Sequence, residues 1–261
     1  MAISASIPVT VSAPSSVTPD LFEDFSTYTS TANFIADPRN IYRAGEDKNT
    51  QQMFLAVGEG LNGGKAIEYR YPAARITVDY TISRSIDAET LWGTNVTNVW
   101  WEQVVRFSDN FDMYDPTNPP STGLKFMHAG VRNPQSSRFG GVIQQHDYQS
   151  RYLLGYPDNE QFITGIPGFD CSTMFGSGQW HTFRFRYKVN VPYATPNGIC
   201  SVILPNGTTS NNQNLNIPRS NIFKLATTQN MNEKPATATY MSMFIGSITV
   251  YHGSNDPGWG I

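Results

Sequence analysis

Charge, cysteine and long apolar runs are all scarce in this sequence of 261 residues. Only 15% of the residues are charged and the formal net charge is −3, so no bulk basic field directs the chain to nucleic acid. Two cysteines, Cys171 and Cys200, cannot form a disulfide framework or a four-ligand metal site. No apolar run reaches the roughly 20 residues of a membrane-spanning helix. We therefore expect no nucleic-acid partner and no membrane partner.

Long amphipathic helical patterns are also missing, whereas turn-forming and aromatic residues are abundant. The chain has 21 glycines, 17 prolines and 13% aromatic residues, a composition that suits many short strands. It excludes a coiled coil, a collagen-like fibre and global disorder. We expect an all-β fold, an antiparallel two-sheet sandwich whose core is large enough to need no disulfides.

The first 19 residues carry no charge and differ in composition from the rest of the chain. Pro8, Pro14 and Pro19 prevent a regular helix, and alternating serine, threonine and valine favour an extended conformation. Serines interrupt the apolar residues and no basic residue precedes them, so the segment does not fit a signal peptide. We predict an extended N-terminal arm over residues 1–20 and a sandwich domain over residues 21–261.

Hydrophobic alternation predicts the strands of that domain, with short helical turns at residues 21–25, 33–36 and 87–92. The stretches 115–122 and 205–217 are rich in Asn, Pro and Gly and predict loops, and the glycine-rich residues 58–64 predict a hairpin loop. The predicted strands are Met53–Val57, Lys65–Tyr71, Ile76–Ser83, Val99–Phe107, Gly123–Gly130, Gly141–Tyr148, Arg151–Leu154, His181–Val189, Ile199–Leu204 and Ser242–His252.

Two of these strands carry information about function. In residues 180–189 aromatic side chains alternate with arginines, so one face meets the core and the other forms a basic strip. In residues 100–107 the even positions place Trp, Glu and Arg on one face. Aromatic rings stack on sugars, and charged groups hydrogen-bond their hydroxyls or carboxylates. We therefore predict a glycan-binding face formed by Trp100, Glu102, Arg106, Arg184 and Arg186. The alternative is a cross-strand ion pair beside a partly buried tryptophan.

The order of several motifs resembles the concanavalin A-like lectin/glucanase superfamily, in particular its polysaccharide-lyase-like and phage-encoded members. The resemblance covers roughly residues 21–259 and implies a jelly-roll sandwich, a fold that hosts lectins, hydrolases, lyases and passive coat modules. The motifs are Phe22-Glu23-Asp24-Phe25-Ser26-x-Tyr28, Trp101–Ser108 followed by Gly123-Leu124-Lys125-Phe126, Gly178-x-Trp180-His181-Thr182, the Asn206-Gly207 turn, Gly246–Tyr251 and Asp256-Pro257-Gly258-Trp259.

Two enzyme templates of the superfamily can be compared with this chain. Retaining glucanases carry Glu-x-Asp-x-x-Glu on one strand, and no such triplet occurs here. Gln144-Gln145-His146 matches the Gln-x-His motif of alginate-lyase-like members. In those enzymes Gln and Arg neutralise the uronate carboxylate, His or Tyr removes the C5 proton, and Tyr protonates the leaving oxygen. The resemblance implies these roles for Arg106, Gln144, His146 and Tyr152.

The lyase pattern is incomplete in this sequence. The segment 152–156 lacks the lysine of the lyase strand, and the residues around Arg106 do not reproduce the arginine motif. A polar outer strand face at Gln144 and His146 therefore remains the alternative. His128 and His181 share faces with apolar residues and predict core histidines.

We expect no cofactor, and a structural calcium, which several families of this fold hold, is the alternative that the resemblance leaves open. Asp24 or Glu23 would meet Asp256 if both termini lie side by side. Ordinary exposed carboxylates are the alternative.

Three functions from different classes follow. The uncharged arm and the closing tail favour a phage virion module, a capsid decoration or appendage protein with a glycan-binding face. The alternatives are a polysaccharide lyase for acidic, uronate-containing glycans and a carbohydrate-binding lectin. We predict that residues 1–19 contact other virion proteins or further copies of the chain, forming a homo-oligomer. The protein would then reside in the virion, after assembly in the host cytoplasm.

Overall fold

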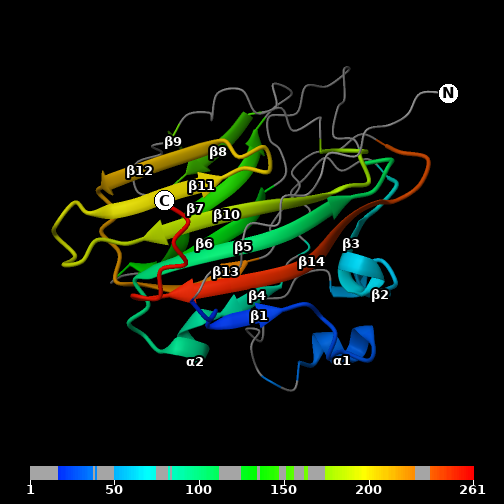
Figure 1. The fold of residues 1–261 in the computed structure, drawn as a ribbon, viewed down its shortest axis with the longest axis horizontal. Coiled ribbons are helices and arrows are strands. Elements are labelled where there is room, and N and C mark those ends of the chain that lie inside the picture. The colour runs from blue at the N-terminus through cyan, green and yellow to red at the C-terminus, as the bar shows by residue number, and fades with distance from the viewer. Residues whose placement is uncertain are drawn as a thin grey trace.

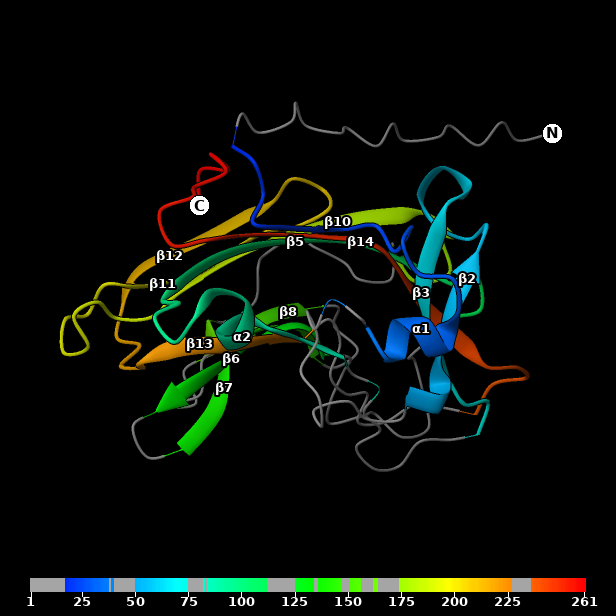
Figure 2. The same ribbon diagram turned by 90° about the horizontal axis from the view of Figure 1, so that it is seen from below.

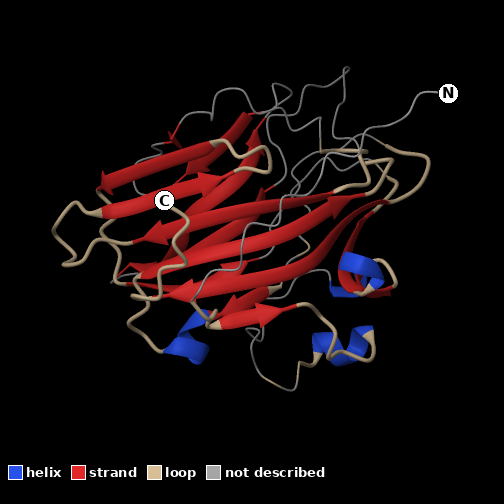
Figure 3. Ribbon diagram, viewed as in Figure 1, coloured by secondary structure: helices blue, strands red, loops and turns tan. Residues whose placement is uncertain are grey.

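The structure is a computed structural model. It describes residues 17–37, 39, 50–74, 82, 84–111, 125–133, 136–146, 151–155, 162–163, 174–226 and 236–261. Within these residues the chain forms two facing antiparallel sheets (Figure 1). Strands make up most of the ordered elements (Figure 3), as the composition predicts. The predicted all-β, two-sheet sandwich is therefore confirmed.

The larger sheet lies at the front in Figure 1 and has eight strands in the described part of the chain. Seven follow the order β12-β11-β10-β5-β14-β3-β2, and β1 pairs with the far end of β14. Their bounds are β1 Leu21–Glu23, β2 Met53–Val57, β3 Lys65–Tyr71, β5 Asn98–Phe107, β10 Trp180–Lys188, β11 Gly198–Ile203, β12 Thr209–Leu215 and β14 Met241–His252.

The second sheet has six strands among the described residues, in the order β4-β13-β6-β7-β8-β9. It lies behind the first in Figure 1 and below it in Figure 2. Its strands are β4 Ser85–Asp87, β6 Lys125–Asn133, β7 Ser136–His146, β8 Arg151–Gly155, β9 Phe162–Ile163 and β13 Asn221–Ala226.

Two short α-helices lie at the margins of the sheets, α1 at Thr31–Ile35 and α2 at Ala88–Trp92. Each begins at a residue whose side chain accepts a hydrogen bond from the first turn, Ser30 from the Asn33 amide and Asp87 from the Thr90 amide. Such caps satisfy amides that have no partner within the helix. Single turns of 3₁₀-helix cover Thr50–Gln52 and Leu61–Gly63.

The core fills the space between the two sheets. Phe183, Phe185 and Tyr187 of β10 are fully buried there, beside Trp101 and Phe107 of β5. The alternation predicted for both strands is therefore confirmed, with the arginines of β10 on the opposite, outer face.

Several predicted elements differ from the structure. Residues 21–23 form strand β1 instead of a helical turn, because their backbone pairs with residues 248–250 of β14. Residues 209–215 lie in the predicted loop 205–217 but form strand β12 on β11. Strand β13 was not predicted. The predicted strand Ile76–Ser83 lies outside the described residues except for the buried Ile82.

The first and last described segments lie side by side. The Asp20 carboxylate accepts hydrogen bonds from the backbone amide of His252 at 2.8 Å and from the side chain of Asn255 at 3.0 Å. Asn255 also donates to the carbonyl of Thr18. Residues 1–16 of the predicted arm lie outside the described residues.

Candidate functional site

The predicted glycan-binding residues gather on the outer face of the eight-stranded sheet, the face that points away from the six-stranded sheet. Arg184 pairs across the ladder with Glu102, and Arg186 pairs with Trp100. The Arg184 Nε donates to Glu102 Oε2 at 2.7 Å, and the Arg186 guanidinium lies 4.5 Å from the centre of the Trp100 ring. The structure thus contains the cross-strand ion pair beside a tryptophan that was the alternative to a glycan-binding face.

The C-terminal tail, residues 253–261, covers this part of the face. In Figure 1 it crosses in front of β5 and β10. Arg186 Nη1 donates to the carbonyl of Ile261 at 2.6 Å, and the Arg184 guanidinium lies 5.3 Å from the centre of the Trp259 ring. Trp100 is only 2% exposed, and burial lowers the pKa of Arg186. A sugar therefore has no access to the Trp100 ring while the tail is in place.

Arg106 lies on the same outer face, near the other end of β5. Its Nη2 donates to Glu59 Oε2 at 2.6 Å, and its guanidinium contacts the rings of Trp180 and Phe244. The prediction that Arg106 shares a face with Trp100 is confirmed. Its neighbours, however, are a different set of side chains from those around Trp100.

The lyase candidates are divided between the two sheets. Arg106 belongs to β5 of the eight-stranded sheet, whereas Gln144 and His146 lie in β7 and Tyr152 in β8 of the six-stranded sheet. In the β7–β8 ladder Tyr152 takes the register position of Gln145, one residue out of step with Gln144 and His146. Arg151, not a predicted site residue, is the partner of His146. The structure therefore brings Gln144 and His146 onto one strand but does not bring Arg106 to them.

The outer face of the six-stranded sheet also holds two cations around one aromatic ring. Lys224 and Arg132 come from the neighbouring strands β13 and β6, with Nζ and the guanidinium carbon 5.4 and 4.8 Å from the centre of the Phe223 ring. Gly130 makes room for them, because a Cβ there would lie 2.5 Å from Cγ of Lys224. The Arg132 Nε donates to Glu89 Oε1 of α2 at 3.1 Å.

Sequence analysis missed this group because it depends on a bulge. The β13–β6 register shifts between Ile222 and Lys224, so Phe223 leaves the core-facing position that simple alternation would give it. The signal in the sequence is the short apolar run 222–226 with a single lysine inside it. His128 is fully buried in the adjoining β6, as a core histidine would be.

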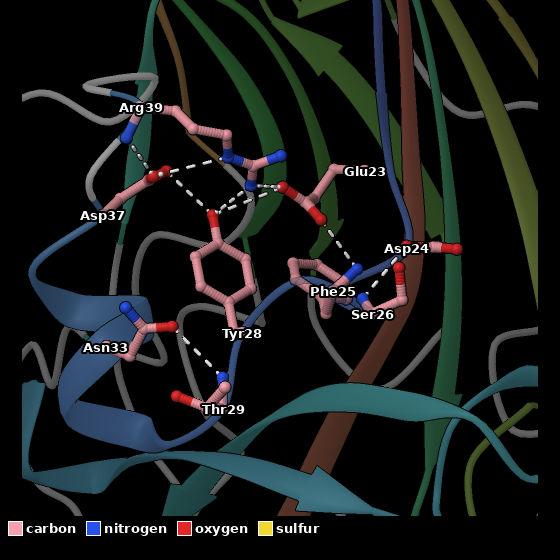
Figure 4. A network of polar contacts seen from close by, with 9 residues as sticks. All are labelled: Glu23, Asp24, Phe25, Ser26, Tyr28, Thr29, Asn33, Asp37 and Arg39. Atoms are coloured by element: carbon pink, nitrogen blue, oxygen red, sulfur yellow. Dashed lines mark hydrogen bonds and ion pairs between the residues drawn. The ribbon is translucent and has the colours of Figure 1, made fainter.

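A buried polar network holds the segment after β1, as Figure 4 shows. The Tyr28 hydroxyl lies 2.8 Å from Asp37 Oδ2 and 3.3 Å from Glu23 Oε2. The guanidinium of Arg39 contacts Glu23 and donates to the Tyr28 oxygen. Burial, followed by the charge of Glu23, raises the pKa of Tyr28 well above its usual range. The guanidinium of Arg39 thus lies between the two carboxylates, Glu23 and Asp37, where a metal ion would otherwise balance their charge.

The predicted calcium ligands serve turns. Asp24 accepts from the backbone amide of Ser26, and Asp256 accepts from that of Gly258. It is Asp20, outside the predicted pair, that joins the two ends of the chain. Among the described residues no group of three or more His, Cys, Asp and Glu side chains has the arrangement of a metal site.

The remaining titratable candidates are buried. Burial lowers the pKa of His181, whose Nε2 lies 3.1 Å from the hydroxyl of Ser177. Burial also raises the pKa of the free thiol Cys200, which keeps it protonated and unreactive. Cys171 lies outside the described residues. In the described part of the chain, no helix is long and apolar enough to span a membrane.

Comparison with known proteins identifies the fold. No family model matches the chain, and no curated protein matches it in sequence. An endo-β-1,4-glucuronan lyase from the fungus Trichoderma reesei superposes with a TM-score of 0.59 at 10% identity, over 92% of this chain and 99% of the lyase. The alginate lyase Aly36B gives 0.54 at 12% identity, over 88% and 95%.

A third similar structure comes from a virus. The carbohydrate esterase of the Shiga toxin-encoding bacteriophage phi24B superposes with a TM-score of 0.50 at 16% identity, over 91% of this chain and 100% of the esterase. These matches confirm the predicted jelly-roll sandwich, a fold that the two polysaccharide lyases share. At such identities they show the fold alone.

Proposed function

We propose that the protein binds acidic, uronate-containing polysaccharide through the outer face of the six-stranded sheet. The observation that carries this proposal is the placement of Arg132 and Lys224 around Phe223 on the neighbouring strands β6 and β13. Guanidinium and ammonium groups are the side chains that pair with carboxylates. Gln144 and His146 lie in β7, the next strand of the same sheet. A chain of uronates lying across this sheet would run over β13, β6 and β7 in turn.

The shared fold supports this choice of ligand. Two of the similar structures are named as lyases of glucuronan and alginate, and the likeness runs over nearly the whole of each chain. The predicted glycan site at Trp100 is less suited, because the C-terminal tail lies over it. Of the two outer faces, the six-stranded sheet is therefore the better supported.

Eliminative cleavage at this face is the second candidate. The reaction needs a group that neutralises the uronate carboxylate, a base for the C5 proton and an acid for the leaving oxygen. Gln144 and His146 keep the roles that the sequence predicts for them. Arg106 is replaced by Arg151, whose backbone lies directly opposite His146. Tyr152 opposes Gln145 in the ladder and so belongs to the other face of the sheet, which removes it from this group.

We also propose that the module works as part of a phage particle, attached through residues 1–19. The uncharged, proline-containing composition of this segment supports the proposal, as does the likeness to a bacteriophage esterase. The glycan-binding face would then serve the particle in recognising a host surface.

Calorimetric titration of the full chain with oligoglucuronate and oligoalginate tests the binding proposal. Lys224→Gln and Arg132→Gln should each weaken binding at least tenfold, and binding should fall with salt because it depends on charge. Lys188→Gln removes a lysine from β10 of the other sheet and should leave binding unchanged. Equal affinities of wild type and Lys224→Gln, with the fold intact, would contradict the proposal.

Cleavage is tested separately by the ultraviolet absorbance of the unsaturated ends that elimination creates. The wild-type protein should release them from glucuronan or alginate, and His146→Ala and Arg151→Gln should abolish the signal while leaving the Lys224-dependent binding measurable. Binding without any release of unsaturated ends would retire the lyase candidate and keep the binding proposal.

A further inference from the structure

Two arginines on the outer face of the eight-stranded sheet are each packed between aromatic rings. The Arg106 guanidinium lies 4.4 Å from the centre of the Phe244 ring and 5.2 Å from that of Trp180. The Arg70 guanidinium lies 3.9 Å from the Phe54 ring centre and 4.8 Å from that of Tyr240. The C-terminal tail contacts the other end of this face, around Arg184 and Arg186.

Strand register makes these side chains one continuous row. Trp180 of β10 is the ladder partner of Arg106 in β5. Arg106 is in turn the partner of Phe244 in β14, and Phe244 is the partner of Glu68 in β3. Directly opposed residues lie on one face about 4.5–5.5 Å apart. Arg70 follows Glu68 by two residues and so lies on the same face. We call the row the arginine–aromatic strip, formed by Trp180, Arg106, Phe244, Glu68, Arg70, Phe54 and Tyr240.

A glycine fixes the ring at one end of the strip. The β14 register shifts between Ile245 and Ser247, which makes Gly246 a bulge residue. A Cβ at Gly246 would lie 2.9 Å from the Trp180 ring and 3.0 Å from Cγ of Leu61. The indole of Trp180 therefore packs closely against the β14 backbone. At the other end, Tyr240 is 49% exposed and presents an aromatic ring to solvent.

Together with Glu59 beside it, the strip carries no net charge, because each arginine has a glutamate partner. Glu59 accepts from Arg106, and Glu68 binds Arg70 through two hydrogen bonds of 2.8 Å. The Ser242 hydroxyl also donates to Glu68 at 2.6 Å. Donors and acceptors thus alternate beside aromatic rings. That combination suits sugar hydroxyls, which both donate and accept hydrogen bonds.

We infer that the arginine–aromatic strip is a second glycan-binding surface and that its ligand is a neutral oligosaccharide. The sugar rings stack on Tyr240 and Trp180, and their hydroxyls bind the arginine–glutamate pairs between them. This surface is on the opposite sheet from the proposed acidic-glycan face. The two therefore bind different sugars and are independent of one another.

Ligand-observed NMR and calorimetry of the full chain test the inference with neutral hexaoses linked through glucose, mannose and galactose. At least one should bind, and Tyr240→Ala should weaken that binding at least tenfold. Tyr193→Ala is the matched control, because Tyr193 is similarly exposed at 46% but lies in the loop between β10 and β11. It should leave the affinity unchanged.

Two further arms separate this inference from the proposed function. Lys224→Gln should leave neutral-sugar binding intact, whereas Tyr240→Ala should leave oligoglucuronate binding intact. The inference is overturned if no neutral hexaose binds, or if Tyr240→Ala and Tyr193→Ala weaken binding equally. It is also overturned if Tyr240→Ala weakens binding of oligoglucuronate instead of the neutral sugar. None of these results depends on whether the acidic-glycan proposal holds.

Discussion

Tyr28 illustrates how a single residue connects distant parts of this fold. Its hydroxyl lies within hydrogen-bonding distance of Asp37 and Glu23, and its ring packs edge-on against Phe34. A phenol carries one proton, so Tyr28 donates to one of these buried carboxylates while its oxygen accepts from Arg39. The residue therefore links β1 to the segment after α1 through polar contacts inside an apolar environment.

Tyr28→Phe should lower the free energy of unfolding by about 1–3 kcal/mol, because a buried carboxylate loses its donor and Arg39 loses an acceptor. It should also change the pH dependence. The raised pKa of Tyr28 means that the folded state holds its phenolic proton more tightly than the unfolded chain does. The stabilisation is complete below the ordinary tyrosine pKa, about 10, and decreases as pH rises above it.

Denaturant titrations of both proteins between pH 7 and pH 11 measure this effect. The difference in unfolding free energy should be constant up to about pH 9.5 and then shrink. Tyr193→Phe, at an exposed tyrosine, supplies the control. A difference that stays constant across the alkaline range would show that Tyr28 ionises equally well in both states.

At the scale of elements, the clearest alternation gave the most accurate predictions. Strands β2 and β3 have the predicted bounds, and residues 58–64 form the predicted hairpin loop between them. Strand β12 was missed because its sequence, TSNNQNL, has no apolar alternation. It is an edge strand held by backbone bonds to β11, and local sequence does not encode those bonds.

For the candidate sites, too, the sequence predicts features local to one strand but not those that depend on distant segments. Residue parity placed Trp100, Glu102 and Arg106 on one face, because that property is local to a strand. The tail that covers Trp100 comes from more than 150 residues later in the chain, so no pattern around Trp100 indicates it. Likewise, the two sheets that separate Arg106 from His146 follow from topology, which the motif spacing does not contain.

Deleting residues 256–261 should uncover the part of the predicted glycan-binding face that contains Trp100, Arg184 and Arg186. Arg184 would lose its contact with the Trp259 ring, and Arg186 would lose its hydrogen bond to Ile261. The truncated chain should then bind an anionic aromatic dye such as anilinonaphthalene sulfonate, because a bare indole and two cations would face solvent. Its melting temperature should fall by a few degrees.

Dye fluorescence and thermal melting measure both effects. Arg186→Gln in the truncated chain should remove most of the added dye binding. The deletion leaves Asn255 in place, so the contact with Thr18 is retained. Unchanged fluorescence and melting temperature would mean that the tail contributes nothing to covering this face.

At the scale of the whole molecule, the N-terminal segment leads to a prediction about self-association and attachment to a particle. Residues 1–19 contain Ile3, Ile7, Val9, Val11 and Val17 but no charge. An uncharged extended segment can add to a strand edge or lie along a neighbouring subunit. Deleting residues 1–16 should therefore weaken self-association or particle attachment while leaving the melting temperature nearly unchanged.

Light scattering and co-sedimentation with particles follow the two outcomes. The deletion ends before Thr18 and Asp20, so the contacts of Asn255 and His252 with the first described segment remain. Normal assembly of the shortened chain would remove the main argument for a virion role, whereas a large fall in melting temperature would show that the arm belongs to the domain itself.

The pairing of the chain's two described ends also sets a direction for the molecule. Residues 17–20 lie along the end of β14, and the tail crosses the same eight-stranded sheet (Figure 2). A tether joined ahead of residue 17 therefore starts from that side. The opposite sheet, with Arg132 and Lys224, then faces away from the anchor. In the proposed particle the eight-stranded sheet would be the attached side, and an array of copies would display the cations of the six-stranded sheet outward.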